Sequence, residues 1–249
     1  MACEYDSSNK GRWYKLTNCI QITMYITQII GHHPPQNIVT WNTLISGYVE
    51  HDDAMHVTKI YREMQQLGIT PDRVTFLCML KASSNIRSIT HGMVIHDEVI
   101  RLELESDVMV GNSMVDMYVK CGVLPKAQET FNDLPMRDVA TWNALIAGYA
   151  QHALGNKAVD CFTQMQGEGM LPDAITFTCV VKACGGIGAL KHGRLLHDHV
   201  IRSGIDVDVV ISTALIDMYA RCGSSMEAHR AFEKAHIRNE VSWTALISA

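Results

Sequence analysis

The chain contains the segment WNTLISGY at residues 41–48 and, 101 residues later, the segment WNALIAGY at residues 142–149. A third copy, WTALISA, occupies residues 243–249, so three of the four tryptophans stand at one repeated position. The same shift carries the pair PD at 71–72 onto 172–173. Self-similarity at a fixed offset is the signature of repeat architectures. The chain is therefore predicted to be built from structural repeats.

Each block of 101 residues divides into three repeats. An acidic or amide residue stands just before a short hydrophobic segment at intervals of 35, 35 and 31 residues, and this rhythm occurs twice. The boundary residues are Asn37, Asp72, Asp107, Asp138, Asp173, Asp208 and Asn239.

The pattern inside a repeat predicts paired helices. Apolar side chains in residues 108–138 recur at i, i+3, i+4 and i+7, the spacing of a packed helix face, at Met114, Met117, Tyr118 and Cys121. A single helical hairpin cannot bury such a face, so stacked hairpins supply one another's core. We therefore predict an all-α fold, a right-handed α-solenoid of stacked helix-turn-helix hairpins.

Composition limits the classes of protein. The 249 residues are 47% hydrophobic and 19% charged, enough apolar side chain for a sizeable core. A net charge of −5 argues against binding to nucleic acid or anionic lipid through bulk charge. No stretch approaches the roughly 18 apolar residues of a membrane span, so no membrane partner is expected. The amino end shows neither a signal peptide nor a transit peptide.

Motifs of catalysis and metal binding are incomplete. No two of the eight cysteines are spaced as C-x-x-C, which favours free thiols over a disulfide framework or a zinc site. The triplet HDE at residues 96–98 matches half of a zinc deaminase signature, but no P-C-x-x-C follows and the equivalent triplet at 197–199 is HDH. Glycine-rich phosphate loops and a G-x-S-x-G elbow are also absent. We expect no enzymatic activity, no metal and no cofactor.

Three sets of residues resemble a known repeat family. TWNTLISGY with a terminal PD, DMYVKCG with a terminal PMRD, and HGRLLHDHVIRSG resemble the pentatricopeptide repeats of plant organelles, in the subclass that alternates P, L and S repeats. Tetratricopeptide repeats have a similar length, but their W-x-x-L-G-x-x-Y opening and late proline are not found in these repeats.

The resemblance implies a division of the chain. The P repeats are 38–72 and 139–173, the L repeats 73–107 and 174–208, the S repeats 108–138 and 209–239, and residues 240–249 begin a further P repeat. Residues 1–37 are unassigned or a degenerate hairpin. The chain resembles a truncated member or a fragment that lacks the C-terminal domains of the subclass.

This resemblance implies binding of single-stranded RNA at one base per repeat. In the family the fifth and the last residue of a repeat read the base. The P and S repeats carry Asn42 with Asp72, Asn112 with Asp138, Asn143 with Asp173, and Thr213 with Asn239, and the L repeats carry Leu77 with Asp107 and Thr178 with Asp208. The alternative is structural, because Asn and Asp are also polar groups of helix starts, N-caps and turns.

Hydrogen-bonding capacity predicts the bases. An ionised Asp only accepts, which suits the N–H of U or G, whereas Asn also donates and suits A or C. The family prefers pyrimidines where the fifth residue is Asn and purines where it is Thr. Together these rules predict the RNA 5′-U-N-U-U-(G)-A-3′, with the amino end over the 5′ side. The repeat with Leu77 is unread, because this side chain forms no hydrogen bond.

Two further groups of residues are candidates for RNA contacts. The resemblance implies that the second residue of each repeat packs against the base, at Val39, Val74, Met109, Ala140, Ile175 and Val210. These apolar residues equally suit packing between repeats. Candidate phosphate ligands, four or eight residues after the base-reading position, are Lys81, Lys120, Lys182 and Arg221. The alternative is that they are solvated surface cations, and nearby Asp116 and Asp217 weaken the positive potential.

Two functions follow from these patterns. The first is sequence-specific binding of organellar RNA, in a mitochondrion or chloroplast, that serves RNA editing or processing by an effector supplied in trans. The second is a scaffold whose concave surface binds proteins or peptides. The first is favoured because a peptide groove has no need of Asn and Asp pairs at these positions.

Overall fold

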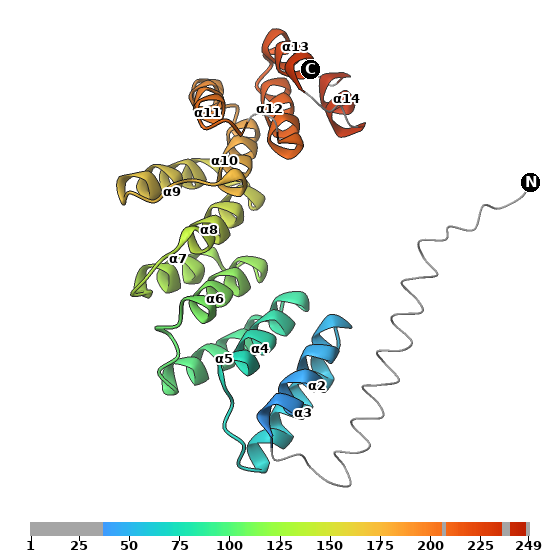
Figure 1. The fold of residues 1–249 in the computed structure, drawn as a ribbon, viewed down its shortest axis with the longest axis vertical. Coiled ribbons are helices and arrows are strands. Elements are labelled where there is room, and N and C mark those ends of the chain that lie inside the picture. The colour runs from blue at the N-terminus through green and yellow to red at the C-terminus, as the bar shows by residue number, and fades with distance from the viewer. Residues whose placement is uncertain (1–36, 206–207, 236–239, 248–249) are drawn as a thin grey trace, which may run out of the picture. The chain divides into compact units, whose positions relative to one another are not determined.

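The computed structural model describes residues 37–205, 208–235 and 240–247, and all regular elements in these ranges are α-helices (Figure 1). The expected all-α fold of helical hairpins is confirmed. The first helices of the hairpins are α2 (Ile38–Glu50), α4 (Arg73–Asn85), α6 (Val108–Lys120), α8 (Val139–Gln151), α10 (Ala174–Gly186), α12 (Val209–Arg221) and α14 (Glu240–Ile247). The second helices are α3 (Ala54–Gln66), α5 (Ile89–Arg101), α7 (Leu124–Asp133), α9 (Gly155–Gly167), α11 (Leu190–Arg202) and α13 (Ser225–Lys234).

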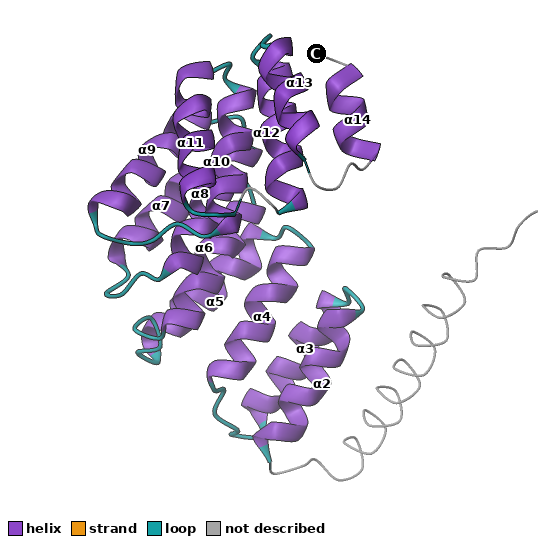
Figure 2. Cartoon of the chain, turned by 45° about the horizontal axis from the view of Figure 1, so that its top comes forward, coloured by secondary structure: helices purple, strands orange, loops and turns teal. Residues whose placement is uncertain are grey.

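We number the hairpins 1 to 6 from α2–α3 to α12–α13, and α14 follows hairpin 6 (Figure 2). Each first helix begins at the residue that follows a boundary Asn or Asp of the sequence. The second helix has 10 residues in hairpins 3 and 6 and 13 residues in the other four. A shorter second helix therefore accounts for most of the difference between the 31-residue and 35-residue repeats.

The chain divides into two compact units, of which the first ends at Met117 and the second begins at Tyr118. In the first unit, α2 packs on α3 and α4, and α4 packs on α5. Trp41 and Leu80 are fully buried in this unit, and the ring of Phe76 meets Tyr61 edge-on at 6.4 Å. Burial of one such large apolar side chain contributes roughly 1.5–3 kcal/mol.

In the second unit the repeated tryptophan joins neighbouring hairpins. Trp142 of α8 is fully buried and meets Phe131 of α7 edge-on at 4.6 Å. Trp243 of α14 makes the same contact with Phe232 of α13 at 4.5 Å. The tryptophan that reveals the repeat is thus a packing residue between one hairpin and the next.

Candidate nucleic-acid interface

In the first unit, the pair predicted from hairpin 1 is formed. Asn42 of α2 donates from Nδ2 to Oδ1 of Asp72, the N-cap of α4, at 2.9 Å. Thr75 joins both side chains, since its hydroxyl donates to Asn42 Oδ1 at 2.7 Å and its backbone N–H to Asp72 Oδ1 at 3.0 Å. The backbone N–H of Asp72 donates to Thr75 Oγ1 at 3.2 Å, which completes a capping box.

The second unit repeats this network in hairpin 4. Asn143 Nδ2 donates to both carboxylate oxygens of Asp173, at 3.0 and 3.2 Å. The hydroxyl of Thr176 donates to Asn143 Oδ1 at 2.6 Å, and its backbone N–H donates to Asp173 Oδ1 at 2.8 Å. Because the amide nitrogen faces a carboxylate and the amide oxygen faces a hydroxyl, the orientation of the amide is set in both units.

The hydrogen bonds keep the two carboxylates ionised. Burial acts to raise the pKa of Asp72, but the Thr75 backbone N–H, the Asn42 amide and the Thr75 hydroxyl together lower that pKa below its ordinary value. The pKa of Asp173 is lowered in the same way, against burial, by Thr176 and Asn143. Each pair therefore offers a carboxylate acceptor beside an amide donor.

Asp107 and Asp208 cap helices without forming such a network. Asp107 accepts the backbone N–H groups of Met109 and Val110 and a guanidinium N–H of Arg73 at 3.3 Å. Leu77, its predicted partner, is apolar.

In hairpin 5 both predicted partners bond to the backbone. The hydroxyl of Thr178 donates to the carbonyl of Ala174 at 2.8 Å, while Asp208 accepts the backbone N–H groups of Val210 and Ile211. The polar residues predicted to read bases in hairpins 2 and 5 thus bind the backbone or a neighbouring guanidinium, and the weak base reading expected there stays a prediction.

Two further predicted pairs, Asn112 with Asp138 and Thr213 with Asn239, can each be described for one residue only. Asp138 forms a capping box with Thr141, whose backbone N–H donates to Asp138 Oδ1 at 2.8 Å. Asn112 belongs to the other compact unit, so its pairing with Asp138 stays a prediction. The hydroxyl of Thr213 donates to the carbonyl of Val209 at 2.7 Å, and Asn239 lies outside the described residues.

The predicted base-packing residues are exposed. The exposed fraction lies between 43% and 63% for the five large ones, and Ala140 is exposed as well. These five are Val39, Val74, Met109, Ile175 and Val210. The residue that follows each of the last four is completely buried, so the second position of a helix faces solvent where the third faces the core.

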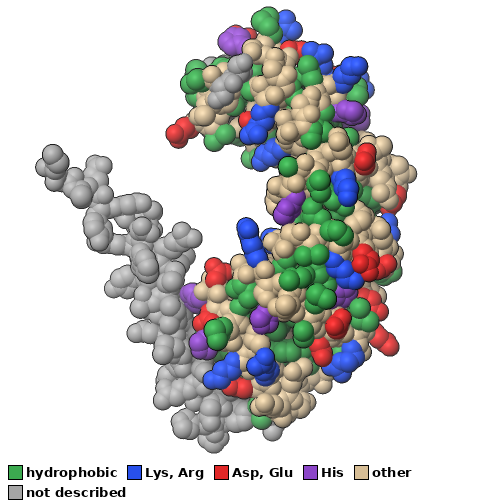
Figure 3. Space-filling model, turned by 180° about the vertical axis from the view of Figure 1, so that it is seen from behind, with side chains coloured by type: hydrophobic (Ala, Val, Ile, Leu, Met, Phe, Trp, Pro, Cys, Tyr) green, Lys and Arg blue, Asp and Glu red, His purple; other side chains and the backbone are tan. Residues whose placement is uncertain are grey.

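The four candidate phosphate ligands are exposed; Lys120 and Arg221 are the last residues of α6 and α12, whereas Lys81 and Lys182 lie about one turn before the ends of α4 and α10. Arg221 forms an i,i+4 ion pair with Asp217 at 2.8 Å, which partly neutralises its charge. Burial raises the pKa of the Cys78 and Cys179 thiols, and the positive charges of Lys81 and Lys182 act in the opposite direction. On the face drawn in Figure 3, Lys and Arg side chains are scattered among acidic and uncharged ones.

The described cysteines are partly or fully buried, whereas most of the described histidines are exposed. Six cysteines in the described ranges are free, and burial raises the pKa of Cys161 and Cys184 to about 11. His197 of the HDH triplet contacts the hydroxyl of Tyr219 at 2.8 Å through Nδ1. Among the described residues, no cluster of three or more His, Cys, Asp or Glu could hold a metal, and no helix is long and apolar enough to span a membrane.

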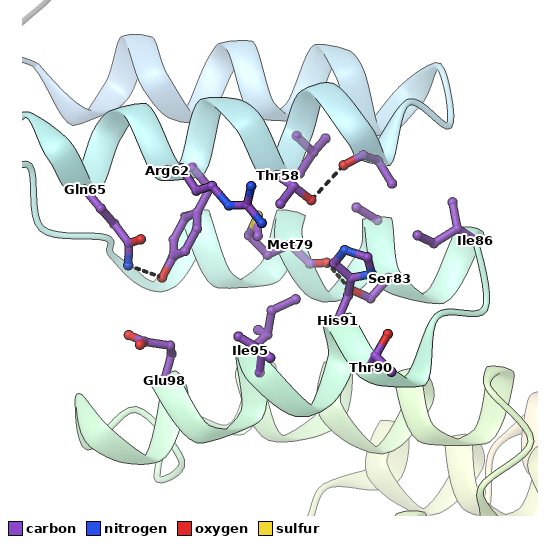
Figure 4. A pocket seen from close by; sticks show the side chains of 15 residues that line it. Thr58, Arg62, Gln65, Met79, Ser83, Ile86, Thr90, His91, Ile95 and Glu98 are labelled. Atoms are coloured by element: carbon purple, nitrogen blue, oxygen red, sulfur yellow. Dashed lines mark hydrogen bonds between the residues drawn. The ribbon is translucent and has the colours of Figure 1, made fainter.

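A groove of about 330 Å³ is lined by residues of α3, α4 and α5 and includes none of the paired residues (Figure 4). Its lining includes Met79, Ile95 and Val94, and Val94 is 62% exposed. An equivalent groove of about 290 Å³ lies between α9 and α11 in the second unit, with Leu195 in the place of Val94.

Three threonines that complete the boundaries were missed by sequence reasoning. Thr75, Thr141 and Thr176 are completely buried and each forms a capping box with the Asp three residues before it. The signal was the spacing D-x-x-T, which is a capping-box pattern.

Stacked hairpins with polar pairs recurring at their boundaries define a helical-repeat protein. Models of the PPR repeat family match residues 36–85 and 137–186, and models of the PPR repeat match residues 112–139 and 210–238. The chain belongs to the pentatricopeptide repeat family.

Relatives in Arabidopsis thaliana carry the family name. One pentatricopeptide repeat-containing protein is 35% identical over 99% of this chain and 35% of its own length. Two others, named mitochondrial and chloroplastic, are 35% and 34% identical over 87% and 88% of this chain, and over 39% and 26% of their own lengths. The chain therefore spans between about a quarter and two fifths of these curated relatives.

Solved structures share the fold. The pentatricopeptide repeat protein PPR10 in complex with an 18-nt psaJ RNA element matches with a TM-score of 0.76 and 20% identity, over 90% of this chain and 35% of that chain. The structure titled PPR10 from maize matches with a TM-score of 0.66 and 19% identity, over 86% of this chain and 32% of that chain.

Proposed function

We propose that the chain binds single-stranded RNA and reads it at one base per hairpin. The observation that carries this proposal is the pair formed twice, by Asn42 with Asp72 and by Asn143 with Asp173. Support comes from PPR10, a protein of the same fold whose structure contains an RNA element.

The geometry of a pair suits uracil. An ionised carboxylate has about four lone-pair sites. The hydrogen bonds from Asn42 and from the Thr75 backbone go to Oδ1 of Asp72, and Oδ2 of Asp173 accepts one from Asn143, so a lone pair of Oδ2 can accept the N3–H of uracil in both pairs. The second N–H of the Asn42 amide then donates to a uracil carbonyl. Exposed Val39 and Val74, at the second positions of neighbouring hairpins, supply the apolar surface on which the base packs.

The pairs together specify the RNA 5′-U-N-U-U-(G)-A-3′. Hairpins 1 and 4 carry the two formed pairs and read the first and fourth bases, and hairpin 3 reads the third through Asn112 and Asp138. Hairpins 2 and 5 contribute little, because Asp107 binds Arg73 and Thr178 binds the backbone. Phosphate contacts come from Lys81, Lys120, Lys182 and Arg221.

We place this activity in organellar RNA metabolism. Relatives named mitochondrial and chloroplastic support this, as does the rhythm of 35, 35 and 31 residues, which resembles the P, L and S subclass. The bound RNA would be presented for editing or processing to an effector that acts in trans, since no catalytic motif was found in the sequence.

Binding to short RNAs tests the proposal. We expect the chain to bind a fluorescent RNA containing UNUUGA, and to lose at least tenfold in affinity when the uridines at the third and fourth positions become adenines, because two sets of base contacts are lost. Fluorescence anisotropy at low salt measures both affinities. Equal affinities for the two RNAs would show that the pairs do not read bases.

A protein scaffold is the second candidate function. The two equivalent grooves favour it, because both expose large apolar side chains between second helices. The same binding experiment separates the candidates, since a scaffold without RNA specificity would bind neither RNA at low salt.

A further inference from the structure

The two formed pairs share a third side chain that is hidden from solvent. Thr75 and Thr176 have exposed fractions of 0%, so they cannot touch a bound RNA. Their hydroxyls donate to Asn42 Oδ1 and Asn143 Oδ1 at 2.7 and 2.6 Å. Their backbone N–H groups hold the carboxylates of Asp72 and Asp173 at 3.0 and 2.8 Å. Either threonine can therefore influence a bound base only through the Asn and Asp side chains of its pair.

We infer that Thr75 and Thr176 are positioning residues that determine which bases the Asn–Asp pairs accept. The inference rests on the proposed RNA binding. With the hydroxyl in place, a lone pair of the amide oxygen is occupied, and the pair presents an amide N–H beside a carboxylate oxygen. This arrangement complements uracil, which offers a carbonyl oxygen beside an N–H.

Without the hydroxyl the amide oxygen has no donor. The amide is then held only through its nitrogen, by the carboxylate. Its second N–H can shift toward N3 of cytosine, an acceptor, while the exocyclic amino group of cytosine donates to the carboxylate. The buried hydroxyl thus protects the preference for uracil over cytosine, two bases of equal size that differ in this edge.

Hairpins without the threonine support this role. The third residues of α6 and α12 are Val110 and Ile211, both completely buried and without a hydroxyl. At these two boundaries the carboxylates of Asp107 and Asp208 bind the backbone, and no Asn stands at the fifth position of the preceding hairpin. The threonine and the formed pair therefore occur together at these boundaries.

The test replaces one hydroxyl by a methyl group in the full chain. We expect Thr176→Val to lower the preference for an RNA with uracil opposite hairpin 4 over the same RNA with cytosine there, by roughly three- to tenfold, as for the loss of one hydrogen bond. Most of the change should come from tighter binding of the cytosine RNA. Thr176→Ser, which retains a hydroxyl, should keep the preference of the natural protein.

A matched control separates positioning from stability. Ser88 caps α5 by accepting the backbone N–H of His91, and it takes no part in a pair. Ser88→Ala should lower the unfolding midpoint and leave the base preference unchanged.

Two outcomes overturn the inference in distinguishable ways. If Thr176→Val weakens both RNAs equally and the ratio of affinities stays that of the natural protein, the threonine only caps a helix. If the natural protein itself does not prefer uracil, base reading fails and the inference fails with it. Should circular dichroism show that Thr176→Val is unfolded, Thr75→Val carries the same test in the other unit.

Discussion

At the scale of the residue, one side chain both caps a helix and belongs to a pair that we propose reads a base. Asp173 accepts the first N–H groups of α10 as its N-cap and at the same time accepts from the amide of Asn143. The N-terminus of a helix also favours a negative charge, which adds to the stability of this arrangement. The two readings of the boundary aspartates, base recognition and helix capping, are therefore compatible.

Exchanging the carboxylate for an amide should change the base that is read. In Asp173→Asn the last residue can donate, so we expect hairpin 4 to prefer cytosine to uracil, with a change in the ratio of affinities of roughly tenfold. Asn is as good an N-cap as Asp, so the unfolding midpoint should fall only by the loss of the negative charge at the N-terminus of α10. Competition binding between RNAs that differ at the fourth base measures the preference.

Asp208→Asn is the matched control for this exchange. Asp208 is also an N-cap, of α12, but without a capping box, and its predicted partner Thr178 bonds to the backbone. The variant should leave the preference at the fourth base unchanged. A uracil preference that persists in Asp173→Asn would contradict the assignment of this residue to base reading.

The paired Asn and Asp residues could be predicted from the sequence, but the threonine that holds them could not. Asn42 and Asp72 could be selected because their spacing matches a family pattern. The role of Thr75 could not be derived from the pattern, since it depends on a contact across 33 residues between two helices. Asp107 has no polar partner at the fifth position, where Leu77 stands, and it binds Arg73 instead.

At the scale of the element, the ends of the helices follow the boundary residues. A side chain that accepts the first N–H groups of a helix stops it from extending backwards, which is why the starts could be located from Asp and Asn alone. The ends of the first helices differ among hairpins. Gly122 and Gly223 end α6 and α12 with φ of +76° and +70°, whereas Asp52 and Ala153 adopt a positive φ without being glycine.

A glycine at position 153 should stabilise the protein. Ala153 has φ +58°, and the N–H of Leu154 donates to the carbonyl of Tyr149 at 2.9 Å in the manner of a Schellman motif. The left-handed region costs an L-residue roughly 1–2 kcal/mol, part of which is offset by the entropy that glycine loses on folding. We expect Ala153→Gly to raise the free energy of unfolding by about 0.5–1 kcal/mol, measured by urea denaturation.

The control for this exchange lies three residues earlier. Ala150 is inside α8, where a glycine costs about 1 kcal/mol relative to alanine. Ala150→Gly should therefore lower the free energy of unfolding. A decrease in both variants would mean that the turn at Ala153 carries no strain that glycine can relieve.

At the scale of the whole molecule, the repeat determines what could be predicted. The offset of 101 residues was enough to predict an all-α array of hairpins, because neighbouring copies bury one another's apolar faces. The division into two compact units at Met117 and Tyr118 was not predicted. It falls inside α6, where the sequence continues its helical pattern and gives no sign of a boundary.

Net charge bears on how the whole chain would bind RNA. With a charge of −5 and four candidate phosphate ligands, one of them paired with Asp217, the affinity for RNA should depend on base contacts more than on charge. Each phosphate contact on a single strand contributes roughly −0.7 to the slope of log affinity against log salt. We therefore expect a slope no steeper than about −3, from titrations of the UNUUGA RNA at increasing salt.

Two lysines of hairpin 5 make this expectation specific. Lys182 is on the first helix α10, whereas Lys191 is on the second helix α11, and both are exposed. Lys182→Gln should make the slope shallower by about 0.7, because one phosphate contact is lost. Lys191→Gln removes the same charge from the molecule and should leave the slope unchanged. Equal slopes for the two variants would mean that Lys182 acts only through net charge. A slope much steeper than about −3 in the natural protein would mean that further cations bind the RNA.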